Sequence, residues 1–131
     1  MTLLTRALTE CQTLQGRSAG EWLFREGEEP QGIYVLHSGA VDMLYSAAKG
    51  DPKPLRVAQA PQVLGVTELI SGKRHNCSAM TRTTCLLGFV DKDRVLAMLD
   101  ENSAAWFSVL EALSEDVDSC YASMRSLTAA R

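Results

Sequence analysis

The stretch that decides the fold is GEWLFREGEEPQGIYVLHSGAV, from Gly20 to Val41. Glycine and proline separate its short apolar runs, which is the pattern of strands joined by turns. Ser38-Gly39 is predicted to form a tight turn between two strands, because glycine adopts a positive φ without steric cost. The apolar residues alternate with a period of two, which predicts that one set of side chains faces inward. The predicted inward set is Trp22 and Phe24, Ile33 and Val35, and Val41 and Met43.

The strand pattern continues to about Val90. Ala47–Pro54, AAKGDPKP, is predicted to be a polar hairpin loop. Short, regularly spaced strands are typical of a small antiparallel roll or sandwich, which we expect over residues 20–90. The candidate strands are Glu21–Arg25, Gly32–His37, Ala40–Tyr45, Leu55–Gln59 and Cys85–Val90, with a weaker one at Cys77–Thr81.

Helical periodicity flanks this region. Apolar residues at helical spacing predict a short amphipathic helix over residues 3–14. Asp91 is the expected N-cap of a short helix, and a long helix is predicted over about 103–127. The whole chain, 1–131, is therefore expected to be one mainly β domain, with C-terminal helices over 91–127.

The long helix carries apolar residues in steps of four and three, which is a heptad seam. Two interpretations remain open: the seam pairs with a second copy in a homodimer, which three heptads favour, or it packs on its own β-roll. The seam residues are Trp106, Leu110, Leu113, Val117, Cys120, Met124 and Leu127.

Composition narrows the function. The net charge of -3, without a Lys/Arg run, argues against nucleic-acid binding. There is no apolar stretch of membrane-spanning length and no secretory signal, so we expect a cytoplasmic protein with no membrane contact. The four cysteines have no metal-ligand spacing and are expected to be reduced. No catalytic motif is present, so the chain is not expected to be an enzyme.

The joint spacing of Gly20, Gly27, Gly32 and Gly39 with the apolar alternation resembles the first three strands of a cyclic nucleotide-binding domain. Residues 64–79 and 87–90 resemble the second half of the same roll, so the resemblance covers about residues 3–127. It implies an antiparallel β-roll, or jelly roll (double-stranded β-helix), with an N-terminal helix and a long C-terminal helix. It also implies a regulatory sensor similar to that of catabolite-activator-type transcription regulators, acting in signal transduction.

In that family a phosphate-binding cassette opens with Gly-Glu and closes with Arg and a small residue. The corresponding stretch here is GVTELISGKRHNCSA, residues 65–79. Val66 stands where the family's ribose-binding Glu belongs, His75 stands where its phosphate-binding Arg belongs, and Arg74 is one residue early. The ligand contacts that the resemblance implies are Gly65, Val66, Thr67, Glu68, Leu69, Lys73, Arg74, His75, Asn76 and Cys77.

Both altered positions argue against ordinary cAMP or cGMP binding, because valine accepts no hydrogen bond and the bidentate Arg contact is lost. Rescue by Arg74, Lys73 or protonated His75 stays open. Lys73-Arg74-His75 is either a site for another phosphate-bearing ligand or a solvated turn. Glu68 either replaces the ribose partner or, as we favour, is an exposed carboxylate near a helix N-terminus.

Haem ligation by His75 and Cys77 is a minor alternative, and no cofactor is otherwise indicated. Tyr121 or Met124 are weaker candidates for capping a bound base. The favoured function is a ligand-sensing domain that binds a non-standard or weak nucleotide or phosphate ligand and acts through its C-terminal helix. Two alternatives remain: a ligand-free interaction or dimerisation module, and the sensor half of a transcription regulator without its helix-turn-helix, since no DNA-binding domain follows in this chain.

Overall fold

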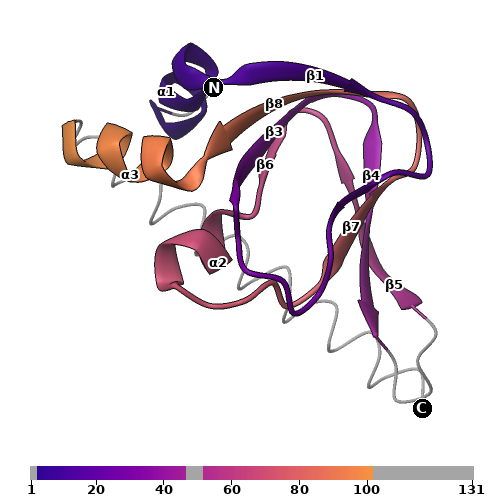
Figure 1. The fold of residues 1–131 in the computed structure, drawn as a ribbon. Helices are drawn as coiled ribbons and strands as arrows, with labels where there is room; N and C mark the ends of the chain where they lie inside the picture. The colour runs from indigo at the N-terminus through magenta and orange to yellow at the C-terminus, as the bar shows by residue number, and fades with distance from the viewer. Residues whose placement is uncertain (1–2, 47–51, 102–131) are drawn as a thin grey trace.

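The computed structural model describes residues 3–46 and 52–101. They form two four-stranded antiparallel sheets, in the orders β1-β8-β3-β6 and β2-β7-β4-β5, with α1 and α3 next to each other at one side (Figure 1). The predicted mainly β roll with flanking helices is confirmed. The elements are α1 (Leu3–Cys11), β1 (Thr13–Arg17), β2 (Trp22–Phe24), β3 (Gly32–Ser38), β4 (Ala40–Ser46), β5 (Pro52–Gln59), β6 (Gln62–Leu64), α2 (Val66–Ser71), β7 (Ser78–Thr81), β8 (Cys85–Asp91) and α3 (Lys92–Glu101).

The turn at Ser38-Gly39 is a corner between the two sheets. β3 belongs to the first sheet and β4 to the second, and the chain passes from one to the other at Gly39. Gly39 has φ +96°, and a Cβ at this position would lie 2.5 Å from the Thr84 carbonyl oxygen. The predicted turn is confirmed, and glycine is required there for its backbone conformation and for the close approach.

Two apolar clusters hold the domain together. The first fills the space between the sheets, with Tyr34 and Leu36 of β3 and Val41 and Met43 of β4 among its members. The second packs α1, α2 and α3 against the outer face of the first sheet and contains Ile33 and Val35. The prediction that Ile33 and Val35 face the roll interior was therefore wrong. β3 is buried on both faces, and alternation alone does not tell which face is inside.

The N-terminal helix ends earlier than predicted. α1 stops at Cys11, and Thr13–Arg17 form β1, which pairs antiparallel with β8. Leu14 is 59% exposed on this strand instead of belonging to the apolar face of the helix. A short edge strand with polar residues at alternate positions carries little periodic signal, so tertiary pairing decided its conformation.

Two further expectations on strands need correction. β6, Gln62–Leu64, was not expected, and it pairs with β3. The hairpin loop was predicted to extend to Pro54, but β5 begins at Pro52. Proline is tolerated there because β5 is an edge strand of the second sheet.

The short helix near the end of the described chain is confirmed as α3. The Asp91 carboxylate accepts a hydrogen bond of 3.0 Å from the Arg94 backbone N–H, which makes Asp91 the N-cap. The predicted helix over about 103–127, with its seam residues and with Tyr121, lies outside the described residues. No helix within 3–46 or 52–101 is long and apolar enough to cross a membrane.

Candidate functional site

The helix in the stretch that corresponds to the cassette, α2, is flanked by two glycines. Gly65, with φ +89°, leads from β6 into α2, and Gly72, with φ +72°, ends the helix. Val66 is 2% exposed and packs with Leu69 in the second apolar cluster, between the helices and the first sheet. The residue at the family's ribose-binding position therefore belongs to the core of the domain.

Glu68 lies in the same short helix, and the expectation that its carboxylate is exposed was wrong. Glu68 is 9% exposed. It lines a hollow of about 200 Å³ together with Lys73, Arg74 and Lys92, on the outer side of the cassette. Glu68 is not among the residues that line the cavity next to His75.

His75 is held by its backbone as well as by its ring. Its N–H donates to the Glu28 carbonyl oxygen over 2.9 Å, and its own carbonyl accepts from the Gly27 N–H over 2.8 Å. The residue is 4% exposed, and its imidazole stacks on Phe24, with ring centroids 3.8 Å apart and planes 11° apart. These contacts fix the ring on the inner side of the loop between α2 and β7.

The charge state of His75 follows from its surroundings. Burial lowers its pKa from the ordinary value of 6.5, and the Glu28 carboxylate opposes that effect. The lowered pKa makes the ring neutral at neutral pH. Its Nδ1 atom is buried and has no hydrogen-bond partner among residues 3–46 and 52–101.

The three side chains of the basic cluster at residues 73–75 do not lie together. Arg74 points outward, where Nη1 donates to the Gly27 carbonyl oxygen over 2.9 Å and Nη2 lies 3.4 Å from Glu29 Oε1. Lys73 is exposed, whereas His75 is buried. Asn76 is also exposed and Cys77 is buried. Four of the ten predicted contacts, Glu68, Leu69, Lys73 and Arg74, line the hollow of about 200 Å³.

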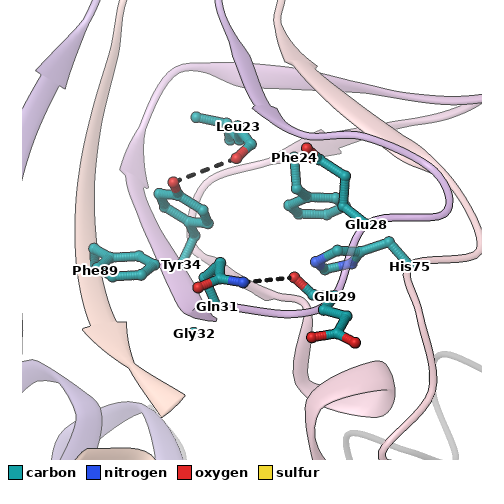
Figure 2. A pocket seen from close by; sticks show the side chains of 9 residues that line it. All are labelled: Leu23, Phe24, Glu28, Glu29, Gln31, Gly32, Tyr34, His75 and Phe89. Atoms are coloured by element: carbon teal, nitrogen blue, oxygen red, sulfur yellow. Dashed lines mark hydrogen bonds between the residues drawn. The ribbon is translucent and has the colours of Figure 1, made fainter.

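A cavity of about 330 Å³ lies next to His75 (Figure 2). A Cβ built on Gly65 would lie 3.7 Å from His75 Cε1 and 3.5 Å from the Gly32 carbonyl oxygen, so the start of the cassette adjoins the cavity wall. Among the described lining residues, His75 is the one predicted ligand contact. The lining residues are Leu23, Phe24, Glu28, Glu29, Gln31, Gly32, Tyr34, His75 and Phe89.

The inner wall of the cavity is aromatic. The Tyr34 and Phe89 rings are 4.9 Å apart and tilted by 52°. The Tyr34 hydroxyl donates to the Leu23 carbonyl oxygen over 3.4 Å. Sequence reasoning missed Glu28, Tyr34 and Phe89 as candidate site residues. The period-two pattern marks such residues as strand or core positions, and only the pairing of distant strands brings them to one wall.

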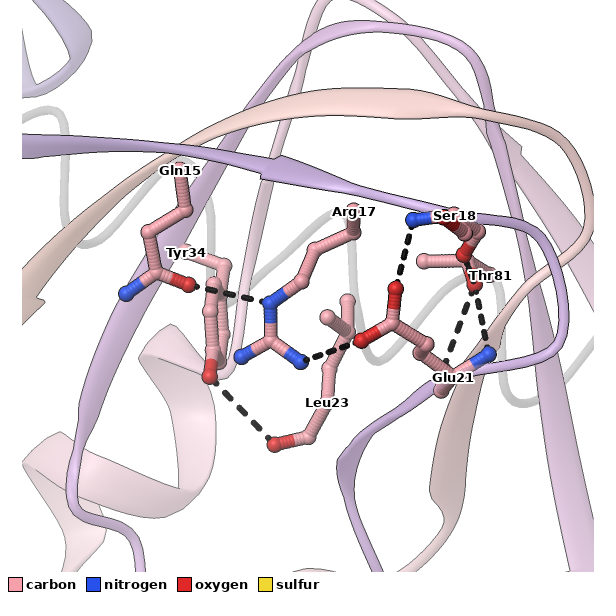
Figure 3. Close-up of polar contacts among 7 residues, drawn as sticks. All are labelled: Gln15, Arg17, Ser18, Glu21, Leu23, Tyr34 and Thr81. Carbon is pink, nitrogen blue, oxygen red and sulfur yellow. Dashed lines mark hydrogen bonds and ion pairs between the residues drawn. The ribbon is translucent and has the colours of Figure 1, made fainter.

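A polar cluster next to Tyr34 holds a cation close to the roll interior (Figure 3). Arg17 Nε donates to Gln15 Oε1 over 3.2 Å, and its Nη1 lies 3.5 Å from Glu21 Oε1. Burial raises the pKa of Tyr34, and the nearby Arg17 guanidinium opposes that effect. Because Arg17 is paired with Glu21, its charge is largely compensated within the cluster.

Comparison with known proteins identifies the family. The model of the cyclic nucleotide-binding domain matches residues 17–102. The chain belongs to this family.

Solved structures of related regulators share the fold. The catabolite activator protein of Thermus thermophilus superposes with a TM-score of 0.79 at 17% identity, over 94% of this chain and 57% of that chain. The c-di-GMP-responsive regulator CLP of Xanthomonas campestris gives 0.78 at 17% identity, over 96% and 62%. The sensor domain of the regulator DNR from Pseudomonas aeruginosa gives 0.71 at 21% identity, over 88% and 77%.

One curated protein is similar in sequence over a shorter stretch. Sodium/hydrogen exchanger 7 of Arabidopsis thaliana is 23% identical over 84 residues, which are 64% of this chain and 7% of the exchanger. The chain thus spans a small part of that protein and about three fifths of the first two regulators.

Proposed function

We propose that this chain is a regulatory ligand-sensing domain that binds standard cyclic nucleotides weakly and takes a non-standard ligand. The observation that supports this most strongly is the state of His75. At the position of the family's phosphate-binding arginine stands a neutral ring, stacked on Phe24 and 4% exposed. A neutral imidazole supplies no charge-assisted fork to a phosphate.

The contacts of two neighbouring arginines support weak binding of a phosphate. Arg74 is bound to Gly27 and Glu29 on the outer side, and Arg17 is paired with Glu21. Val66 offers no acceptor for a ribose hydroxyl. Hydrogen bonds to charged groups contribute roughly 1.5–3 kcal/mol each, so loss of the arginine contact alone is expected to weaken binding about tenfold to a hundredfold.

Relatives of this fold are described with different ligand responses. CLP is described as responsive to c-di-GMP. A regulatory subunit from Trypanosoma brucei is described as part of a cAMP-independent protein kinase A, and it matches with a TM-score of 0.73 at 16% identity. These descriptions support the view that proteins with this fold respond to different ligands.

The output of the domain is proposed to pass through the C-terminal helix. Ligand binding next to His75 would shift the cassette and bias dimerisation or contact with a partner. A second candidate function, a ligand-free interaction module, is favoured by Val66, because an apolar core residue has replaced a ligand contact. The third candidate is the sensor part of a transcription regulator.

Calorimetric titration with cAMP and cGMP tests the proposal. The unmodified chain should bind both with dissociation constants well above the micromolar range. The double variant Val66→Glu/His75→Arg should gain at least about tenfold in affinity, since it restores both family contacts. A matched double variant, Val66→Glu/His75→Gln, restores the carboxylate alone and should gain less. Micromolar binding of cAMP by the unmodified chain would overturn the proposal.

A further inference from the structure

The loop between α2 and β7 is joined to the loop between β2 and β3 at Arg74 and His75. Two backbone hydrogen bonds connect His75 to Gly27 and Glu28. The Arg74 side chain adds a third connection, because Nη1 donates to the Gly27 carbonyl oxygen and Nη2 pairs with Glu29. The backbone next to Arg74 is therefore fixed, and the place of its guanidinium depends on its side-chain torsions.

The Arg74 guanidinium lies close to the edge of the cavity next to His75. Its two partners, Gly27 and Glu29, flank Glu28 in the chain, and Glu28 lines the cavity. Among the described residues, Glu29 lines both this cavity and the outer hollow, to which Arg74 contributes. Figure 2 shows the Glu29 carboxylate directed away from the aromatic rings of the cavity. Glu29 thus holds Arg74 on the outer side of the edge.

A phosphate in the cavity would meet carboxylates and no cation. Glu28 and Glu29 are among the described lining residues, and none of these is a lysine or arginine. The lowered pKa of His75 leaves its ring neutral at neutral pH. Carboxylates disfavour an anion, so such a ligand requires a cation from outside the lining. Arg74 is a cation that already contacts a lining residue.

The ion pair that holds Arg74 outward is weak. Arg74 is 65% exposed and Glu29 is 71% exposed, and Nη2 lies 3.4 Å from Oε1. Exposed pairs of this kind contribute little, because solvent screens them. A phosphate offers the guanidinium two charge-assisted hydrogen bonds in a forked geometry, which are stronger. Glu29 and a phosphate therefore compete for one guanidinium.

We propose that Glu29 sets the affinity of this site for phosphate-bearing ligands by holding Arg74 on the outer side. A phosphate has to draw the guanidinium away from Glu29 before the two can bind. Glu29 acts through Arg74 and is a positioning residue, whereas Arg74 contacts the ligand. The inference rests on the proposed function, because it names a residue that keeps the binding of cyclic nucleotides weak at that same site.

Calorimetric titration of the full chain with cAMP, at concentrations up to millimolar, tests the inference. Glu29→Gln releases Arg74 and should raise the affinity about two- to fivefold, which corresponds to the strength of an exposed ion pair. Glu26→Gln is the matched control, since Glu26 belongs to the same loop and is not among the residues that line either space. It should have a smaller effect, and equal gains from the two variants would contradict the inference.

A double-mutant cycle separates the release of Arg74 from the loss of a negative charge near the phosphate. Arg74→Gln/Glu29→Gln should bind cAMP no more tightly than Arg74→Gln, because the guanidinium that Glu29 withholds is gone. Adenosine, which has no phosphate, should bind equally to the unmodified chain and to Glu29→Gln. A gain from Glu29→Gln that is as large without Arg74 as with it would overturn the inference.

The Arg74 side chain also gives a direct signal. In ¹⁵N-labelled Glu29→Gln, the Arg74 Nε–H resonance, assigned with Arg74→Gln, should shift as cAMP is added. The absence of a shift at a cAMP concentration that half-saturates this variant would show that Arg74 does not reach the phosphate, and would overturn the inference.

Failure of the inference is distinct from failure of the proposed function. If Glu29→Gln gains nothing but Val66→Glu/His75→Arg gains cAMP affinity, the proposed function stands and the role of Glu29 is wrong. If the unmodified chain binds cAMP at micromolar concentration, both are wrong, because no contact is then withheld from the phosphate.

Discussion

His75 shows how a single side chain changes the chemistry of the cassette while the backbone hydrogen bonds of the loop stay the same. The two backbone hydrogen bonds at residue 75 join it to the loop at Gly27 and Glu28, whatever the side chain. The side chain then decides what faces the cavity. An imidazole is short enough to lie flat on Phe24 in a buried place, where its neutral form is favoured.

The stability of the domain should depend on pH through this ring. The folded-state pKa of His75 lies below the ordinary 6.5, so below pH 6.5 the unfolded chain binds more protons than the folded chain. Stability from the neutral ring is fully present above that value and is lost as the pH falls through it. The free energy of unfolding should therefore decrease between about pH 7.5 and about pH 5.5. Urea unfolding over this range measures the decrease.

The control for this prediction is His75→Phe, which keeps the stacked ring and removes the titrating group. Its free energy of unfolding should change less over the same range of pH. Identical pH profiles of the two proteins would contradict a lowered pKa at His75.

The sequence was informative about which residues occupy the cassette positions and silent about where they point. Spacing from Gly65 put Val66 and His75 at the altered positions. The stack on Phe24 and the outward course of Arg74 depend on contacts between segments far apart in the chain, which spacing does not report. The burial of Glu68 was missed for the same reason.

At the scale of elements, β3 is the strand on which the site depends. It is buried on both faces, and it lies between β8 and β6 in the first sheet. Its first residue, Gly32, lines the cavity. A Cβ on Gly32 would overlap the Val90 carbonyl oxygen and would lie 2.7 Å from Phe89 Cζ. The strand approaches β8 so closely there that only glycine fits.

Gly32→Ala should destabilise the domain by about 1–3 kcal/mol, because the added methyl group forces β3 and β8 apart. Gly16→Ala is the matched control, since Gly16 is also in a strand of this sheet and a Cβ there meets nothing within 4 Å. Thermal unfolding of both variants measures the difference. Equal loss in both variants, or none in Gly32→Ala, would contradict the close approach.

The elements that the sequence predicted well are those with a strong local pattern. β3, β4 and β8 have apolar runs bounded by glycine or turn residues, and α3 has an N-cap at Asp91. β1 and β6 lack such a pattern and form because they pair with β8 and β3. The conformation of such short edge strands is determined by the strand with which they pair, and their own sequence pattern does not predict it.

At the scale of the whole molecule, the fold connects the cavity next to His75 to helices at one side of the roll. α1 and α3 cover the outer face of the first sheet, and Ile33 and Val35 of β3 pack against that layer while Tyr34 lines the cavity. A movement of β3 at the cavity would therefore also move the residues of β3 that pack against the helices. This connection is the physical basis for the proposed signal.

The heptad seam predicts a homodimer of the full chain. Sedimentation equilibrium should give twice the chain mass for the unmodified protein and a single chain mass for Leu113→Glu, which places a charge in the seam. Ser108→Glu, off the seam, is the control and should remain dimeric. A monomeric unmodified chain, or a dimeric Leu113→Glu variant, would contradict the prediction.

The proposed function depends on a neutral, stacked imidazole at the position that corresponds to the family's phosphate-binding arginine. The most direct measurement is an NMR titration of the imidazole nitrogens in ¹⁵N-labelled chain, with His75→Phe used to assign the His75 signals. We expect a pKa for His75 below 6.5, so that the ring is neutral at neutral pH, and no change in its signals when cAMP is added at micromolar concentration. A pKa above 6.5, or a shift of the His75 signals at micromolar cAMP, would contradict it.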